Sequence, residues 1–229
     1  MISSEIDTLS TSSAIHSSQA PNTYVTIHHV TAHLVAQNHG LLEYLHAVFA
    51  QVVDEGMTYP QEGDMTEDAF KAYFFGGDVF VAIIDQDGSG KTHGQEIAEG
   101  KVIETTIHAV VNGRSWDESV AGFYYVKPNY PGRSSHNCNA GFVVPPHQRG
   151  RNFGTILAKS YLYYGPRLGY EASVFNLVYV NNTASIRLWD RLGFTKAGVI
   201  PRAGRLKRPD DQGEHFVDAY VYYKRFADK

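Results

Sequence analysis

The stretch SHNCNAGFVVPPHQRGRNFG, residues 135–154, predicts a strand that passes through a short turn into a helix. Within it, NCNAGFVV (137–144) has the alternation and β-branched residues of a strand. Pro145 and Pro146 end this strand, because proline cannot donate a hydrogen bond to a strand ladder. The helix is expected over Asn152–Tyr164, where apolar residues recur at helical spacing.

The turn HQRGRNFG has the composition of an anion-binding site. The first N–H groups of a helix have no partner within the helix, and with the positive end of the helix dipole they attract negative charge. Gly150 and Gly154 let a ligand approach the backbone, and Arg149 and Arg151 add charged donors. Such a turn suits a pyrophosphate, and an ordinary polar loop before a helix is the alternative.

The single cysteine, Cys138, is expected to pack in the core rather than act as a nucleophile. Side chains alternate between the two faces of a strand, so Asn139 and Gly141 share one face while Cys138 and Phe142 share the other. If Asn139 lines a binding site, Cys138 points into the opposite layer as a small apolar residue.

A later segment, NNTASIRLWDRLGF (181–194), predicts a helix over Asn182–Leu192 that ends at Gly193, and Asn182 is a candidate N-cap of this helix. Further helices are expected over about 40–55 and from Thr66. The other expected strands are 23–35, 79–85, 121–128, 173–180, TKAGVIP (195–201) and HFVDAYVYY (215–223). This order predicts an α/β fold with a single mixed β-sheet flanked by helices.

Composition limits the classes of function. A net charge of −4 gives no general attraction to nucleic acid or to an anionic membrane, and no apolar run approaches the roughly 18 residues of a membrane span. One cysteine excludes an internal disulfide. We expect a mobile tail over residues 1–22, one domain over 23–229 and a cytoplasmic location, with a mitochondrial association left open.

Two motifs in the loop after the strand 79–85 are weak evidence for a phosphate site or a calcium site. GSGKT (88–92) lacks the first glycine of a phosphate-binding loop, because Asp85 stands in its place. The acidic residues from Asp85 to Glu96 have the spacing of a calcium loop, but a strand rather than a helix precedes them. We expect an exposed polar loop, an irregular insertion over 95–118 and no metal site.

The basic turn and the later segment together resemble the GNAT superfamily of acetyl-CoA-dependent N-acetyltransferases. In that family an R/Q-x-x-G-x-G/A turn holds the CoA pyrophosphate, and an N-x-x-A-x-x-x-Y-x-x-x-G-F segment closes the site. Asn152 replaces the first glycine, Ser185 the alanine and Trp189 the tyrosine, which in many members protonates the leaving thiolate. An indole N–H is too weak an acid for that role, so the thiolate needs another donor.

The sequence also resembles the fungal acetyltransferases of L-azetidine-2-carboxylic acid and related proline analogues. The segments that carry this resemblance are KPNYPGRSSHNCNAGFVV, LGYEASVFNLVYVNNTAS and LWDRLGF. This resemblance covers about 121–204. It implies that Asn139 binds the substrate carboxylate, and that Asn176 and Leu177 offer backbone amides to the substrate. Phe142 would present its backbone N–H to the thioester carbonyl, and Asn182 would hydrogen-bond the thioester sulfur. The implied acetyl-CoA contacts are Phe142, Val143, Val144, Arg149, Gly150, Arg151, Asn152, Phe153, Gly154, Thr155 and Asn182.

The chemistry of these side chains agrees with such a reaction. An amide such as Asn182 can donate to sulfur without losing a proton, and no carboxylate stands out as a general base. We therefore expect direct attack of a small cyclic or secondary amino acid on acetyl-CoA, and the resemblance suggests a homodimer. The alternatives are an acetyltransferase for another small amine, or a CoA-binding module without turnover, which Trp189 keeps open.

Overall fold

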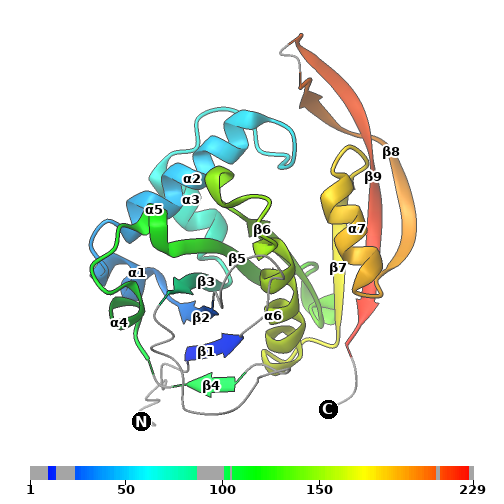
Figure 1. The fold of residues 1–229 in the computed structure, drawn as a ribbon. Helices are drawn as coiled ribbons and strands as arrows, with labels where there is room; N and C mark the ends of the chain where they lie inside the picture. The colour runs from blue at the N-terminus through cyan, green and yellow to red at the C-terminus, as the bar shows by residue number, and fades with distance from the viewer. Residues whose placement is uncertain (1–9, 14–23, 87–100, 104, 210–211, 227–229) are drawn as a thin grey trace.

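The computed structural model describes residues 10–13, 24–86, 101–103, 105–209 and 212–226 (Figure 1). In this part of the chain, nine strands form one mixed sheet in the order β4-β1-β2-β3-β5-β6-β7-β9-β8. The pair β6–β7 is parallel and the other neighbours are antiparallel. Among the described helices, none is long and apolar enough to cross a membrane.

The strands β2, β3, β5, β6 and β7 follow apolar stretches of the sequence, whereas β1 has the polar sequence STSS. Their bounds are β1 Ser10–Ser13, β2 Tyr24–Val30, β3 Asp78–Asp85, β4 Lys101–Ile103, β5 Val120–Pro128, β6 Asn137–Val143, β7 Ala172–Tyr179, β8 Thr195–Lys207 and β9 Glu214–Arg225. The central strands β3 and β5 are buried almost throughout because helices cover both faces of the sheet.

Helices cover the sheet in two layers, each with its own apolar core. One layer holds α1 Ala32–Gln37, α2 Leu41–Glu55, α3 Glu67–Phe74, α4 Ile107–Val111 and α5 Trp116–Ser119. The other holds α6 Phe153–Arg167 and α7 Thr183–Arg191. Figure 1 shows α1 to α5 grouped to one side of the strands and α6 and α7 on the other. The predicted α/β class, with one mixed sheet flanked by helices, is confirmed.

The helix boundaries come from short polar caps. Thr66 accepts a hydrogen bond from the Ala69 amide and starts α3, as the sequence predicts. The expected strand 23–35 is wrong at its end: β2 stops at Val30, because Thr31 caps α1 by accepting from the Leu34 amide.

The region 95–118 is not irregular where the structure describes it. Thr106 caps α4, and Ser115 with Glu118 forms a capping box that starts α5. These helices are too short for an apolar period to reveal them. The loop with GSGKT and the calcium-like spacing lies largely outside the described residues. Within the expected tail 1–22, residues 10–13 form β1, which pairs with β2 and β4.

The sheet opens between β6 and β7, which leaves room for a binding site. β6 and β7 pair over two residues each, from Asn137 and Cys138 to Ala172 and Ser173, and then diverge. The edge of β6 that faces β7 therefore lacks a strand partner from Asn139 onward. Cys138 is buried in the apolar core on the side of the sheet that α6 and α7 cover. This confirms the predicted alternation of side chains between the two faces of β6.

Candidate active site

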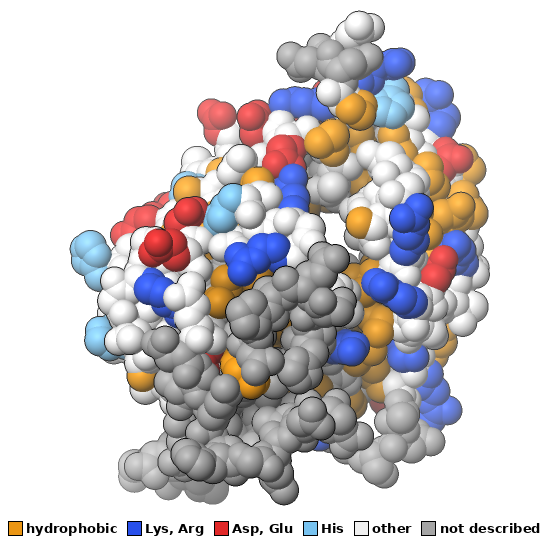
Figure 2. Space-filling view, viewed as in Figure 1, with side chains coloured by type: hydrophobic (Ala, Val, Ile, Leu, Met, Phe, Trp, Pro, Cys, Tyr) orange, Lys and Arg blue, Asp and Glu red, His pale blue; other side chains and the backbone are white. Residues whose placement is uncertain are grey.

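A cavity of about 1150 Å³ occupies the gap between β6 and β7. Figure 2 shows this face hollowed beside α7, with Lys and Arg side chains near the hollow. The structure brings together here all but one of the predicted site residues: Asn139, Phe142, Val143, Val144, Arg149, Gly150, Asn152, Phe153, Gly154, Thr155, Asn176, Leu177 and Asn182. The exception is Arg151, which does not line the cavity.

The turn before α6 leaves space for a ligand. A Cβ atom added at Gly150 or Gly154 would meet no atom within 4 Å, so the backbone there faces open space. Asn152 has a φ of 65°, in the left-handed region where asparagine is the best tolerated residue after glycine. This explains why asparagine can replace the first glycine of the family's turn.

The two arginines of the turn already have protein partners. Arg149 donates to Glu55 at the end of α2 at 2.8 Å, although its side chain also lines the cavity. Arg151 donates to the Gln148 side-chain oxygen, and its guanidinium lies 4.8 Å from the centre of the Phe153 ring. Direct charged contacts of Arg151 with a pyrophosphate stay a prediction, whereas the backbone of the turn is open.

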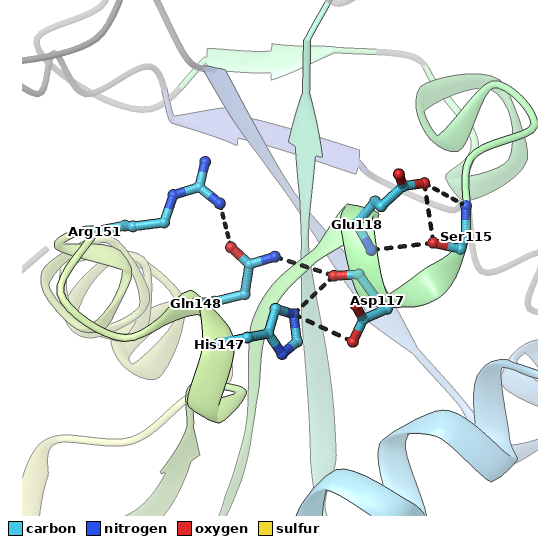
Figure 3. Close-up of polar contacts among 6 residues, drawn as sticks. All are labelled: Ser115, Asp117, Glu118, His147, Gln148 and Arg151. Atoms are coloured by element: carbon cyan, nitrogen blue, oxygen red, sulfur yellow. Dashed lines mark hydrogen bonds and ion pairs between the residues drawn. The ribbon is translucent and has the colours of Figure 1, made fainter.

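The turn is anchored on α5, in the region that the sequence left unexplained (Figure 3). The buried Gln148 donates from Nε2 to the Asp117 carbonyl oxygen at 3.0 Å. The exposed His147 lies 2.9 Å from the same oxygen and 3.3 Å from the Asp117 carboxylate. The short helix α5 thus fixes the loop that precedes α6.

We expect Gln148→Leu to raise KM for acetyl-CoA several-fold and to lower the free energy of unfolding by about 1–3 kcal/mol, because it leaves the donors of Arg151 and the Asp117 carbonyl without their buried partner. His147→Ala removes an exposed contact to the same residue and should change both quantities little. Kinetics and urea unfolding of the two variants check this. Equal effects of the two substitutions would contradict a special role for Gln148.

Asn182 combines two functions at the start of α7. Its side-chain oxygen accepts from the Ser185 amide at 3.1 Å, which caps the helix as predicted. Its Nδ2 group has no hydrogen bond to the described residues. The helix cap therefore holds an amide donor on the cavity wall.

Asn176 and Leu177 lie in a β-bulge. The pairing of β7 with β9 shifts between Phe175 and Val178, so neither residue has a ladder partner there. The Asn176 amide exchanges hydrogen bonds with Asn129, at 2.6 and 3.1 Å. This side chain is occupied, which leaves the backbone of the bulge as the group of Asn176 that can bind a ligand.

Asn139 is half-buried on the cavity wall. Its side chain makes no hydrogen bond with any residue that the structure describes. Phe142 lies three residues further along β6, and its carbonyl accepts from the Tyr59 hydroxyl at 3.1 Å. The N–H and C=O of one residue in a strand point to the same edge, so the Phe142 N–H also points away from β5.

Three tyrosines that the sequence did not single out form an aromatic wall of the cavity: Tyr59, Tyr73 and Tyr125. The hydroxyls of Tyr73 and Tyr125 are 2.8 Å apart. Burial raises the pKa of both Tyr59 and Tyr125, so these phenols stay protonated. Tyr59 stands in the segment MTYP (57–60), outside the stretch 121–204 that carries the family resemblance. Nothing local marks Tyr73 or Tyr125, which reach the site through packing of α3 on β5.

Two candidates for chemistry are placed elsewhere. Burial raises the pKa of the Cys138 thiol to about 11, which keeps it protonated in the core. Trp189 is 5% exposed and packs 4.5 Å from Phe175 and 5.3 Å from Phe142, between ring centres. Trp189, which replaces the family's tyrosine, therefore packs in the apolar core between α6, α7 and the sheet, and it also lines part of the cavity.

Comparison with known proteins agrees with this geometry. The model of the acetyltransferase (GNAT) family matches residues 83–194. N-acetyltransferase aca1 of Schizosaccharomyces pombe is 41% identical over 175 residues, which span 76% of this chain and 75% of that protein. The chain belongs to the GNAT family.

Other similar proteins differ from this chain in length and sequence. Protein SPT10 of Saccharomyces cerevisiae is 30% identical over 82% of this chain, which corresponds to 32% of that protein. A GCN5-related N-acetyltransferase from Kribbella flavida has a TM-score of 0.63 at 22% identity, covering 88% of this chain and 97% of its own. A phosphinothricin acetyltransferase from Sinorhizobium meliloti, in complex with acetyl-CoA, has a TM-score of 0.62 at 14% identity and covers 89% of each chain.

The protein is thus an acetyl-CoA-dependent N-acetyltransferase of the GNAT type. The open backbone at Gly150 and Gly154, the start of α6 and the gap beside β6 fit this cofactor, which supplies an acetyl group as a thioester. Across the described ranges, no group of three or more His, Cys, Asp or Glu side chains could hold a metal ion.

Proposed function

We propose that the protein acetylates the nitrogen of a small cyclic or secondary amino acid, such as L-azetidine-2-carboxylate or a related proline analogue. The observation that carries this is the Asn139 amide, which has no hydrogen-bond partner in the part of the chain that the structure describes. It lies on the wall of a cavity that also holds the Asn176–Leu177 bulge. An amide N–H and free backbone N–H groups are donors for a carboxylate. The aromatic wall supplies apolar contacts for the methylene groups of a ring.

We assign a role in the reaction to each hydrogen-bond donor of the cavity wall that is available to a ligand. Asn139 would bind the carboxylate, and the bulge at Asn176 and Leu177 would offer its backbone amides beside it. The Phe142 N–H would donate to the thioester oxygen, where negative charge develops, and Asn182 Nδ2 would donate to the departing sulfur. Each donor stays protonated throughout, so none depends on a shifted pKa.

No side chain at the acceptor end is a clear general base. Among the described residues that line the cavity, the acidic one is Asp190 on α7, which accepts from Tyr222 and pairs with Lys196. Tyr59 and Tyr125 stay protonated, because burial raises the pKa of each phenol. We propose that water takes the proton, so that kcat/KM rises with pH as the fraction of neutral substrate amine rises.

A CoA-release assay tests the acceptor. We expect turnover with azetidine-2-carboxylate and other ring imino acids that exceeds turnover with a panel of primary amines. Higher activity with primary amines would contradict this acceptor and show that the enzyme acetylates another small amine. Tight binding of acetyl-CoA without turnover on any amine would favour a regulatory CoA-binding module.

Replacing Asn139 by alanine should raise KM for the amino acid about tenfold while kcat changes less, because a hydrogen bond to a charged group contributes about 1.5 kcal/mol. Asn137→Ala is the matched control: Asn137 lies two residues earlier on the same face, does not line the cavity and bonds to the Ser134 carbonyl. Steady-state kinetics with both substrates measure the effect. An unchanged KM in Asn139→Ala would remove Asn139 from the substrate site.

We also propose a homodimer that uses the β8–β9 hairpin. β8 is an edge strand of the sheet, and Val199 and Phe216 on the hairpin are 56% and 51% exposed. Large apolar side chains beside an unpaired strand edge are typical of an interface. Light scattering should give a dimer mass for the wild type and a monomer mass for Val199→Asp with Phe216→Asp. A monomeric wild type would contradict the proposal.

A further inference from the structure

Two arginines of α7, Arg187 and Arg191, line the cavity at positions away from the proposed substrate contacts. Arg149, the third arginine on the cavity wall, is paired with Glu55. Neither Arg187 nor Arg191 has an ion pair or a hydrogen bond from its side chain to the described residues. Both side chains are exposed, so these two charges are available to a ligand.

The positions of the two arginines place them on one side of the helix. Residues four apart on a helix are neighbours on the same face, and like charges at this spacing repel each other. Ala184 and Leu188 continue the same stripe along the cavity. Asp190 also lines the cavity and lies between them in sequence, but Lys196 at 3.2 Å and the Tyr222 hydroxyl at 2.8 Å already engage its carboxylate. A pair of unneutralised arginines is typical of an anion site.

The location indicates which anion fits. By the helical rise of about 1.5 Å per residue, Arg187 lies about 7.5 Å and Arg191 about 13.5 Å along α7 from Asn182. The arginines are therefore displaced from the residue that we place at the reacting sulfur. The cofactor carries two separate anionic groups beyond its sulfur, a diphosphate and a terminal 3′-phosphate. The start of α6 suits the diphosphate through its backbone N–H groups.

We propose that Arg187 and Arg191 bind the 3′-phosphate of acetyl-CoA. A phosphate monoester carries a charge of about −1.5 to −2 at pH 7, and guanidinium groups bind its oxygens in a bidentate geometry. The pair relieves its own repulsion when this dianion is bound. The site makes the protein selective for CoA over 3′-dephospho-CoA, whatever amine accepts the acetyl group.

Calorimetric titration of the full chain with CoA and with 3′-dephospho-CoA tests this selectivity without any acceptor. The wild type should bind CoA about tenfold to a hundredfold more tightly, the range for hydrogen bonds between charged groups. Arg187→Ala with Arg191→Ala should lose most of this preference and keep the wild-type affinity for 3′-dephospho-CoA. Arg187→Lys should keep part of the preference, because lysine retains the charge but not the bidentate geometry.

Arg208→Ala is the matched control, since it removes one positive charge from an exposed position away from the cavity. It should retain the full preference for CoA, and unfolding curves should show that all variants are folded. Equal affinity of the wild type for the two ligands would overturn the proposal. The proposal would also be overturned if the double variant bound CoA and 3′-dephospho-CoA more weakly by the same factor. The arginines would then contact the diphosphate, which both ligands carry.

Discussion

Asn182→Ala is expected to lower kcat about 10²-fold, with a smaller change in KM for either substrate. The variant removes the Nδ2 donor that we place at the departing sulfur, and loss of one such donor typically costs 10²- to 10³-fold. Trp189 cannot replace it by donating a proton, because an indole is too weak an acid and this one is packed in the core. Rates of CoA release at saturating substrate measure the effect.

Alanine at this position also removes the cap of α7, which contributes about 1 kcal/mol. Asn182→Asp separates the two effects, since it keeps an oxygen that can accept from the Ser185 amide while it removes the donor. We expect Asn182→Asp to be as inactive as Asn182→Ala but closer to the wild type in stability. The neighbouring Asn181→Ala, which loses only a contact to the Met57 carbonyl, should remain active. Near-normal kcat in Asn182→Asp would contradict the role at sulfur.

Gly141→Ala is the second substitution with a large expected effect, and it acts on the shape of the site. A Cβ atom at Gly141 would lie 2.5 Å from Cε1 of Tyr125. That ring is 3% exposed and has Phe74 and Tyr73 at 5.2 Å between ring centres, so it cannot move aside. We expect the free energy of unfolding to fall by about 1–3 kcal/mol, as is typical for an overpacked core.

The same clash should disturb both substrates, because Gly141 lies between Asn139 and Phe142 on β6. Gly198→Ala is its control: a Cβ atom there meets nothing within 4 Å. Urea unfolding and steady-state kinetics of the two variants check the expectation. A Gly141→Ala protein with wild-type stability and kinetics would show that the aromatic wall adapts freely, which its packing argues against.

The sequence predicted those features of the site that depend only on residues close together in the chain. The alternation of β6 predicted that Cys138 is buried, and the position of Asn182 before a helix predicted its cap. The left-handed backbone of Asn152 was not predicted, although an asparagine in place of the family's first glycine is a local signal for it. These features depend on neighbours in the chain, so they can be deduced without knowing the tertiary contacts.

Other parts of the site depend on contacts between distant segments. The bulge at Asn176 is visible only from the register of β7 against β9, and its amide is held by Asn129 from another loop. The anchoring of Gln148 on α5 joins residues 31 apart in the sequence. Arg187 and Arg191 did carry a local signal, their spacing of four on a helix, but that spacing alone does not say which face meets a cavity.

The central claim is that Asn139 and the bulge select an amino acid whose ring nitrogen is acetylated. Its most direct test is mass spectrometry of the products formed from acetyl-CoA and an equimolar mixture of azetidine-2-carboxylate and its carboxamide. We expect the N-acetylated acid to predominate by about tenfold in the wild type and this preference to fall in Asn139→Ala. Equal acetylation of acid and carboxamide by the wild type, or no acetylated product at all, would contradict it.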